Sequence, residues 1–313
     1  CLDEQSGKLV WEKRFPHFLT DIIYHRFALG SPTIDAASGN IFCMTSAGVL
    51  CCFSDAGDLL WEHATISEFG RLVFPNGRTG SVALTDELAI LHMTSSGWGP
   101  QGPARDRFFA FDKLTGECVW VSTPGGPPKD ISFSMPVLSW QNGRQVAYAG
   151  LAGGHMACVD ARTGEALWRF PMCTGGMSSS AVLYKDTLIA IHGKENLDTS
   201  TGGRMVAIKL GAEPKPGGEQ LLLGKDHEVW RNDLTAFTSS PILVGNRVYT
   251  TIATGELACV DADTGKVLWE HKLAPDQIHA SPAYGDGRLW VPMNNGEFFI
   301  VKPSDEGMKV LEK

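Results

Sequence analysis

Residues Ala258–His271 read ACVDADTGKVLWEH, and this stretch recurs along the chain. A second copy, MACVDARTGEALWRF, spans Met156–Phe170 and repeats the Cys-Val-Asp, Thr-Gly and Leu-Trp positions. The tryptophan column of the repeat comprises Trp11, Trp61, Trp120, Trp168, Trp230 and Trp269, with Leu311 in its place in the last copy. Successive tryptophans lie about 40 to 60 residues apart, a spacing typical of propeller blades that carry loop insertions.

Each copy closes a unit of four short segments. Between Ser239 and His271 these segments are SSPILVG, NRVYTTIA, GELACVDAD and TGKVLWEH, with Gly, Asn or Asp near the joints. Alternating apolar and polar residues, many of them β-branched, predict strands, and the joints predict tight turns. The glycine four places before most of the tryptophans suits a turn with positive φ. We predict an all-β protein in which the column tryptophans pack between neighbouring units.

The composition excludes several classes of protein. The chain has 313 residues, 35 of them Gly and 17 Pro, and a formal net charge of −8. This acidic balance argues against a nucleic-acid partner, and 43% hydrophobic residues argue against disorder. No apolar run reaches 18 residues, so we expect no transmembrane segment. The first residues already lie within the repeat, and no signal-peptide pattern precedes them.

The repeat predicts a β-propeller of four-stranded antiparallel blades, with six complete blades plus a half blade. The units are 1–15 (partial), 31–64, 80–122, 135–170, 180–231, 240–272 and 281–313. The partial unit has only the last two strands, while the final unit already has its fourth. A ring closed by one blade shared between the two chain ends would need each end to supply the strands that the other lacks, and these ends do not. We therefore expect a single domain that is a piece of a longer chain, whose ring has seven or eight blades.

The cysteines follow the same columns. Cys1, Cys52, Cys158 and Cys259 lie two residues before an Asp or Ser, where other units have Ala. This column favours a small, buried side chain, a role that free cysteine fills. The sequence has no C-x-x-C pair, so we expect neither a zinc site nor a haem attachment site.

The unit resembles the PQQ-like (pyrroloquinoline-quinone-type) β-propeller repeat. The resemblance rests on the D-x-x-T-G-K-x-L-W pattern and on the Ser-Pro starts at Ser31–Pro32, Ser240–Pro241 and Ser281–Pro282, and it covers essentially the whole chain. The family contains quinoprotein dehydrogenases and non-enzymatic bacterial propellers, and the chain looks closest to the latter. The resemblance implies a periplasmic or secreted protein and favours a ring of eight blades.

Two functions remain open, since fold does not settle function. The first is a non-catalytic binding or scaffolding module of the bacterial envelope, with no cofactor. The alternative is a quinoprotein dehydrogenase-like oxidoreductase, which the resemblance implies would hold PQQ and calcium in the axial channel under a disulfide between adjacent cysteines. Cys51 and Cys52 are adjacent, but successive strand residues point to opposite faces. The sequence contains neither the G-x-S-x-G nucleophile elbow of hydrolases nor a Gly-rich phosphate-binding loop. We therefore favour the binding module.

Most of the insertions join strand two to strand three, or one blade to the next, and such loops share one face of a propeller. Only the insertion Gly211–His227 is assigned to the opposite face. We expect a protein, small-molecule or saccharide ligand on the loop-rich face, because long loops on a rigid scaffold often carry binding residues. The candidate contact residues on this face are Tyr24, His25, Arg26, Arg78, Trp98, Arg105, His192 and Lys194.

Two candidates carry specific alternatives. Trp98 lies in a Gly-rich segment, where it could stack on a sugar or quinone ring, anchor a partner, or fold back over an inner strand. Glu195, Asn196 and Asp198 offer oxygen ligands for calcium, but their spacing is not that of a calcium loop. We therefore predict no metal site and keep these three residues as the candidates for one.

Overall fold

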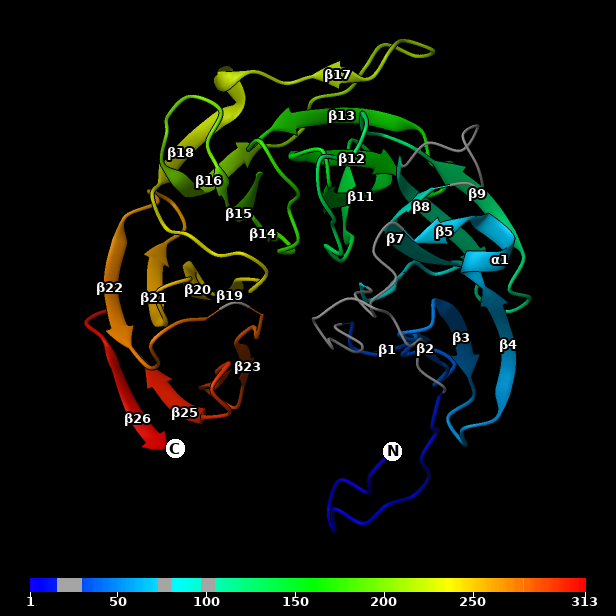
Figure 1. Cartoon of the computed structure of the whole chain (residues 1–313), viewed down its shortest axis with the longest axis horizontal. Coiled ribbons are helices and arrows are strands. Elements are labelled where there is room, and N and C mark those ends of the chain that lie inside the picture. The colour runs from blue at the N-terminus through cyan, green and yellow to red at the C-terminus, as the bar shows by residue number, and fades with distance from the viewer. Residues whose placement is uncertain (16–29, 73–79, 97–104, 278) are drawn as a thin grey trace.

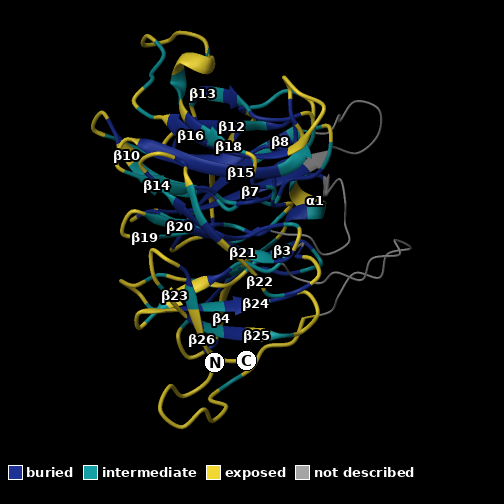
Figure 2. Ribbon diagram, turned by 90° about the vertical axis from the view of Figure 1, so that its left-hand side faces the viewer, coloured by how far each residue is buried: buried dark blue, intermediate teal, exposed yellow. Residues whose placement is uncertain are grey.

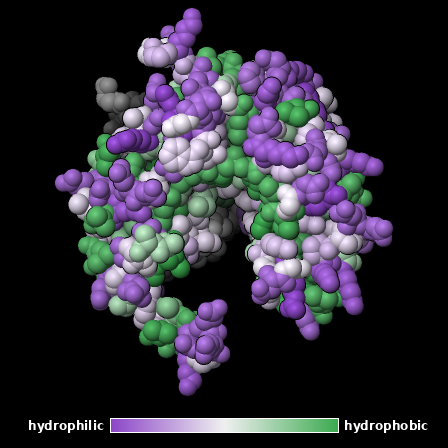
Figure 3. Space-filling view, turned by 180° about the vertical axis from the view of Figure 1, so that it is seen from behind, coloured by the Kyte–Doolittle hydropathy of each residue, from purple (hydrophilic) through white to green (hydrophobic). Residues whose placement is uncertain are grey.

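Six antiparallel sheets surround a central axis, like the blades of a propeller (Figure 1). The computed structural model describes residues 1–15, 30–72, 80–96, 105–277 and 279–313, and all statements below concern these residues. The sheets form an arch that is open between the N-terminal residues and the last blade (Figures 1 and 3). The all-β propeller predicted from the repeat is confirmed.

The blades follow one another in chain order, and each runs from an inner to an outer strand. Blade one contains β1 (Thr33–Ile34), β2 (Ile41–Met44), β3 (Val49–Phe53) and β4 (Leu59–Ala64). Blade two contains β6 (Ala83–Leu84), β7 (Leu88–Ser96), β8 (Arg105–Asp112) and β9 (Cys118–Ser122), with the short β5 (Arg71–Leu72) also paired to β7. Blade three contains β10 (Val137–Gln141), β11 (Arg144–Gly150), β12 (His155–Asp160) and β13 (Ala166–Pro171).

The remaining blades have the same order. Blade four contains β14 (Val182–Tyr184), β15 (Thr187–Glu195), β16 (Gly202–Lys209) and β18 (Glu228–Asn232). Blade five contains β19 (Ile242–Val244), β20 (Arg247–Thr251), β21 (Glu256–Asp261) and β22 (Val267–Lys272). Blade six contains β23 (Ala283–Gly285), β24 (Arg288–Pro292), β25 (Phe298–Pro303) and β26 (Met308–Glu312). The middle strands are buried, whereas turns and outer edges are exposed (Figure 2).

Helix is nearly absent from the described residues. Their helices are α1 (Thr65–Phe69), after blade one, and the 3-10 turn η1 (Lys225–His227), before β18. No helix in this part of the chain has the length and apolarity that a membrane span needs.

The column tryptophans join one blade to the next, as predicted. The indole of Trp230 lies on the turn of blade five so closely that a Cβ at Gly265 would be 2.3 Å from the ring. Its Nε1 donates a hydrogen bond to the carbonyl of Ala262 at 3.0 Å. A glycine is therefore required at position 265 for two reasons: its φ is +72°, and the neighbouring indole leaves no room for a side chain. The same stacking joins Trp11 to Gly57, Trp61 to Gly116 and Trp120 to Gly164.

The cysteine column lies directly across the ladder from the tryptophans. Cys158 pairs with Trp168, and the register shifts immediately after this pair, as in a β-bulge. Corresponding shifts follow Cys52, Ala110, Ala207 and Cys259. These five small residues are fully buried, as predicted, and a small side chain leaves space beside the large indole.

The N-terminal residues depart from the expected pair of strands. Residues 1–15 form a hairpin with one isolated bridge, between Leu2 and Leu9. Trp11 docks on blade one, and its Nε1 donates to the carbonyl of Asp55 at 2.9 Å. Cys1, the fourth cysteine of the column, is exposed, because within the described chain no second strand covers it.

Serines that precede the inner strands, including those of the Ser-Pro starts, connect the blades close to the axis. The backbone N–H of Ser180 donates to Oγ of Ser240, and that of Ser240 donates to Oγ of Ser281, both at 2.9 Å. Ser31 N–H donates in the same way to Ser81 Oγ at 2.8 Å. These hydrogen bonds thus link the inner strands of neighbouring blades, which are not paired with each other in a sheet.

We expect Ser240→Ala to lower the free energy of unfolding by about 1 kcal/mol, because the Ser180 N–H loses its acceptor. Urea denaturation checks this value. An unchanged midpoint would show that the link between the blades does not stabilise the fold.

A buried polar network joins blades two and three. The Asp106 carboxylate accepts hydrogen bonds from Thr94 Oγ1 and from the Ala152 N–H, both at 2.8 Å. His92 Nε2 lies 3.4 Å from the same carboxylate, and its Nδ1 lies 3.2 Å from the Ser134 carbonyl. Asp106 and His92 are each 1% exposed, so this network is sealed within the fold.

Candidate functional site: a pocket beside Asp198 on blade four

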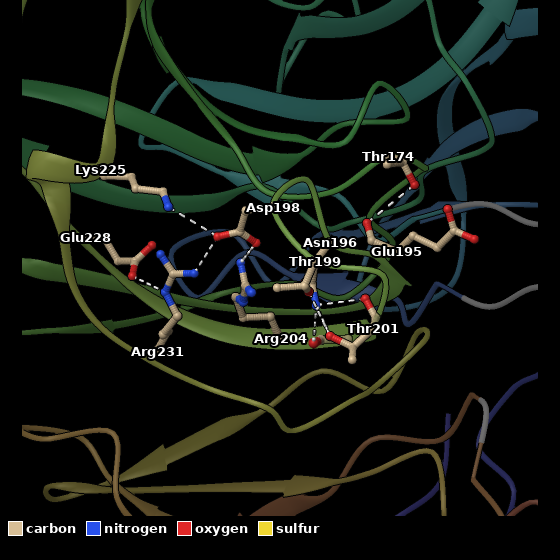
Figure 4. A network of polar contacts seen from close by, with 11 residues as sticks. Thr174, Glu195, Asn196, Asp198, Thr199, Thr201, Arg204, Lys225, Glu228 and Arg231 are labelled. Atoms are coloured by element: carbon tan, nitrogen blue, oxygen red, sulfur yellow. Dashed lines mark hydrogen bonds and ion pairs between the residues drawn. The ribbon is translucent and has the colours of Figure 1, made fainter.

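An ion cluster forms around Asp198, in the loop between β15 and β16. Asp198 Oδ1 lies 2.8 Å from Arg204 Nη1, and Oδ2 lies 2.8 Å from Arg231 Nη1 and 3.3 Å from Lys225 Nζ (Figure 4). Arg231 also binds Glu228 through its Nε. Three cations and two carboxylates therefore converge from β16, β18, η1 and the loop.

The cluster fixes the charge of its central carboxylate. Hydrogen bonds from Arg231, and then from Arg204, hold the pKa of Asp198 well below its usual range. Because the pKa is lowered, the stabilisation from the cluster is fully present above the ordinary pKa of an aspartate and is lost only as the pH falls from there through the lowered pKa. The loop that carries Asp198 is thus held to the blade across the physiological range.

The insertion after β16 takes an unexpected path. The sequence assigned Gly211–His227 to the face opposite the long loops, and its first residues do contact the turn of blade three, where Gln141 Nε2 donates to the Ala212 carbonyl. The chain then crosses the outer edge as β17 (Leu221–Leu222), which pairs in parallel with β13. Its end reaches Asp198 through Lys225, so the assignment of the whole insertion to one face is wrong.

A pocket of about 210 Å³ lies beside the ion cluster. Phe170, Met172 and Leu223 line it and are each at most 5% exposed. Leu197, next to Asp198, also lines the pocket but is 52% exposed. The pocket therefore has a buried apolar wall, an exposed leucine and charged residues fixed in ion pairs.

The three calcium candidates are engaged by protein groups to different extents. Asp198 is bound by three cations, which a calcium ion would have to displace. The Asn196 side-chain NH2 donates to the Thr201 and Gly203 carbonyls, while its Oδ1 is buried without a hydrogen-bond partner among the described residues. The main-chain carbonyl of Glu195 accepts from the Thr174 hydroxyl (Figure 4) and from the Thr174 N–H. In the described part of the chain, no three His, Cys, Asp or Glu side chains are grouped to hold a metal ion.

The other described candidates do not converge on one point. His192 lies in β15 and is 1% exposed; burial, together with the charge of Arg204, lowers its pKa to about 4. It is therefore neutral at physiological pH and is not at the surface, contrary to the expectation of a contact residue. Lys194 forms an ion pair with Asp130 at 2.6 Å, and Arg105 begins β8 in blade two. Five candidates lie outside the described residues, namely Tyr24, His25, Arg26, Arg78 and Trp98.

The axial space shows whether the quinone implied by the resemblance would fit. A cavity of about 280 Å³ there is lined by six serines and two glycines, together with Phe133, Met135, Thr238 and His279. PQQ carries three carboxylates, yet the described lining contains no Arg or Lys to bind them, no Trp for stacking, and no Asp or Glu for calcium. Cys51 and Cys52 are both buried free thiols in β3. These residues do not fit the cofactor.

Several site residues escaped the sequence analysis. Arg204, Lys225, Glu228 and Arg231 carry no motif, and Asp198 meets Lys225 and Arg231 across 27 and 33 residues of chain. Leu197 lies between Asn196 and Asp198, which were chosen as candidates for their oxygen atoms, and was not itself chosen. The run Leu197–Asp198, an apolar residue beside an acidic one within an otherwise polar loop, was the available signal.

Comparison with known proteins supports the fold and assigns the family. The outer membrane protein assembly factor BamB of Shewanella oneidensis is 22% identical over 339 residues, covering 96% of this chain and 79% of the relative. The crystal structure of BamB from Moraxella catarrhalis matches with a TM-score of 0.62 at 16% identity, covering 91% of this chain and 75% of that one.

A quinohemoprotein alcohol dehydrogenase from Pseudomonas putida matches with a TM-score of 0.58 at 14% identity, covering 98% of this chain and 59% of that one. Both structural likenesses concern the fold alone. The family described as outer membrane protein assembly factor BamB matches residues 1–213 and 222–312. The chain therefore belongs to the BamB family of PQQ-like propellers.

Proposed function

We propose that this protein is a non-catalytic propeller of the bacterial envelope that binds a partner protein at the pocket beside Asp198. The proposed process is the assembly of outer-membrane proteins, as the names of its relatives state for them. The observation that carries the proposal is an apolar pocket, with an exposed leucine, beside fixed charges. This arrangement is typical of interface centres, where an apolar core is surrounded by a polar rim.

The size of the pocket favours a protein over a small molecule. Its volume of about 210 Å³ lies below the range of about 300–1,000 Å³ that is usual for small-ligand sites. A space of this size suits a single side chain of a partner, inserted against Phe170 and Met172. The charged groups that border it are already paired with one another, so their proposed role is to hold the loop in place.

Leu197→Asp tests the proposal, because it puts a charge at the exposed edge of the pocket without disturbing the core. Leu114→Asp is the matched control, since Leu114 is 79% exposed in a turn of blade two. Each variant replaces the native protein in the bacterium, and the yield of assembled outer-membrane proteins is measured. We expect Leu197→Asp to lower the yield toward that of a deletion strain and Leu114→Asp to leave it unchanged.

The thermal midpoints of both variants should equal that of the native protein. If deletion itself leaves the yield unchanged, the role in outer-membrane assembly is wrong. If deletion lowers the yield but Leu197→Asp does not, the role stands and the pocket is not the partner site.

A further inference from the structure

Trp140 is a tryptophan outside the blade column, and the fold holds it in solvent. It lies in β10, the inner strand of blade three, and is 70% exposed. The β10–β11 hairpin has five residue pairs, whereas the equivalent hairpins of blades four, five and six have three. The two additional pairs, at Trp140 and Gln141, extend the hairpin and carry the indole outward.

The extension is fixed in place. Its turn, Asn142–Gly143, has φ values of +48° and +82°, as in the tight type I′ turns that suit twisted hairpins. Gln141 is 6% exposed; its Nε2 donates to the Ala212 carbonyl at 2.9 Å, and its Oε1 accepts from the buried Tyr148 hydroxyl at 3.1 Å. Because successive strand residues point to opposite sides, anchoring Gln141 under the insertion turns Trp140 away from it.

Trp140 borders a cleft of about 340 Å³ between blades two and three. The β6–β7 turn supplies Asp86 and Glu87, and blade three supplies Arg144, Asp160 and Arg162. The volume falls within the range of about 300–1,000 Å³ for small-ligand sites, unlike that of the pocket beside Asp198. The cleft is thus a second, separate site, built from turns between consecutive strands rather than from the loops near Asp198.

The charges of the cleft indicate which ligand it would accept. Arg144 lies 3.6 Å from Asp160 and 3.4 Å from Glu165, so its charge is balanced locally. Asp86, Glu87 and Arg162 are exposed, and they present acceptors and donors of opposite charge. A small anion would meet the two carboxylates, and a small cation would meet the guanidinium groups. A neutral ring with many hydroxyls meets partners of both kinds, and its apolar face can lie on the indole.

We propose that the cleft at Trp140 binds a neutral saccharide, with a pyranose ring stacked on the indole and its hydroxyls bonded to Asp86, Glu87 and Arg162. The inference is independent of the partner site on blade four, because the two sites share no lining residue. Stacking on an exposed aromatic ring, with polar groups placed beside it, supplies both the affinity and the orientation.

The test titrates the purified protein with chitotetraose and, separately, with maltotetraose, followed by saturation-transfer NMR and calorimetry. We expect at least one of these neutral sugars to bind the native protein at millimolar concentration or below. Trp140→Ala should weaken that binding by about tenfold or more, whereas Trp140→Phe, which keeps a ring, should retain most of it. Tyr284→Ala is the matched control, since Tyr284 is a half-exposed aromatic residue of another inner strand.

The thermal midpoints of the variants separate loss of binding from loss of fold; Trp140 is so exposed that we expect Trp140→Ala to fold normally. No binding of either sugar to the native protein would overturn the proposal, as would equal binding by Trp140→Ala. Trp140-dependent binding of trilysine in place of the sugars would also overturn it and identify the cleft as a site for cationic peptides.

Discussion

Gly265→Ala is expected to destabilise the fold by about 3 kcal/mol, far more than an ordinary substitution in a surface turn. A non-glycine residue at φ of +72° costs about 1–2 kcal/mol, and forcing a Cβ into packed surroundings costs about 1–3 kcal/mol more. Here the obstacle is the rigid indole of Trp230, held by its hydrogen bond to Ala262. The difference in urea midpoint between variant and native protein measures the effect.

Gly245→Ala is the matched control in the same blade. Gly245 has φ of +61°, but a Cβ there would meet nothing within 4 Å, so only the backbone cost of about 1–2 kcal/mol applies. Equal costs at the two glycines would contradict the stacking of Trp230 on the turn of blade five.

Asp106→Ala is expected to lower the free energy of unfolding by about 2–5 kcal/mol, because each buried donor left without an acceptor costs about 1–3 kcal/mol. The substitution leaves the Ala152 N–H and Thr94 Oγ1 without their acceptor in a site that is sealed within the fold, and it removes the carboxylate that lies 3.4 Å from His92 Nε2. Because the network joins blades two and three, its loss should also loosen the contact between them. Urea denaturation measures the loss of stability, and hydrogen exchange of β8 and β12 measures the loosening.

Asp112→Ala provides the comparison on the same strand. Asp112 accepts hydrogen bonds from Leu114 and Thr115 within its own turn, where water can replace it, so we expect a loss of about 1 kcal/mol. Similar losses for Asp106→Ala and Asp112→Ala would show that burial of Asp106 does not contribute to the stability of the contact between blades.

The repeat could be predicted from the sequence because its physical causes are local. A turn glycine, a small residue and a tryptophan recur at fixed spacing, and each unit meets only its neighbours. Packing of the tryptophans between units was predicted, but the contact of Trp230 with Gly265 in particular was not, since the repeat does not show which residue of the next blade an indole meets. Positive φ alone explained the glycine equally well.

The candidate site was predicted less completely. Asp198 was chosen for its oxygen atoms, yet its partners come from positions whose proximity depends on the path of an insertion that crosses an outer edge. A charged side chain in a loop carries no sign of which distant cation it meets. His192 follows the continuous apolar run Leu188–Ile191 in a long strand, and this run should have placed it inside.

Trp140 had a usable signal. It follows Val137, Leu138 and Ser139 at a position that belongs to no column of the repeat, just before the turn residues Asn142–Gly143. A large aromatic residue at the tip of a hairpin is expected to be exposed.

Site-specific photo-crosslinking in living cells tests the proposed partner site most directly. A photoreactive amino acid replaces Leu197 at the pocket or, as the control, Leu114 in the exposed turn. We predict an adduct with one defined envelope protein from position 197 only, weakened by Lys225→Glu at the edge of the ion cluster. No adduct from position 197, or the same adducts from both positions, would contradict binding of a partner at this pocket.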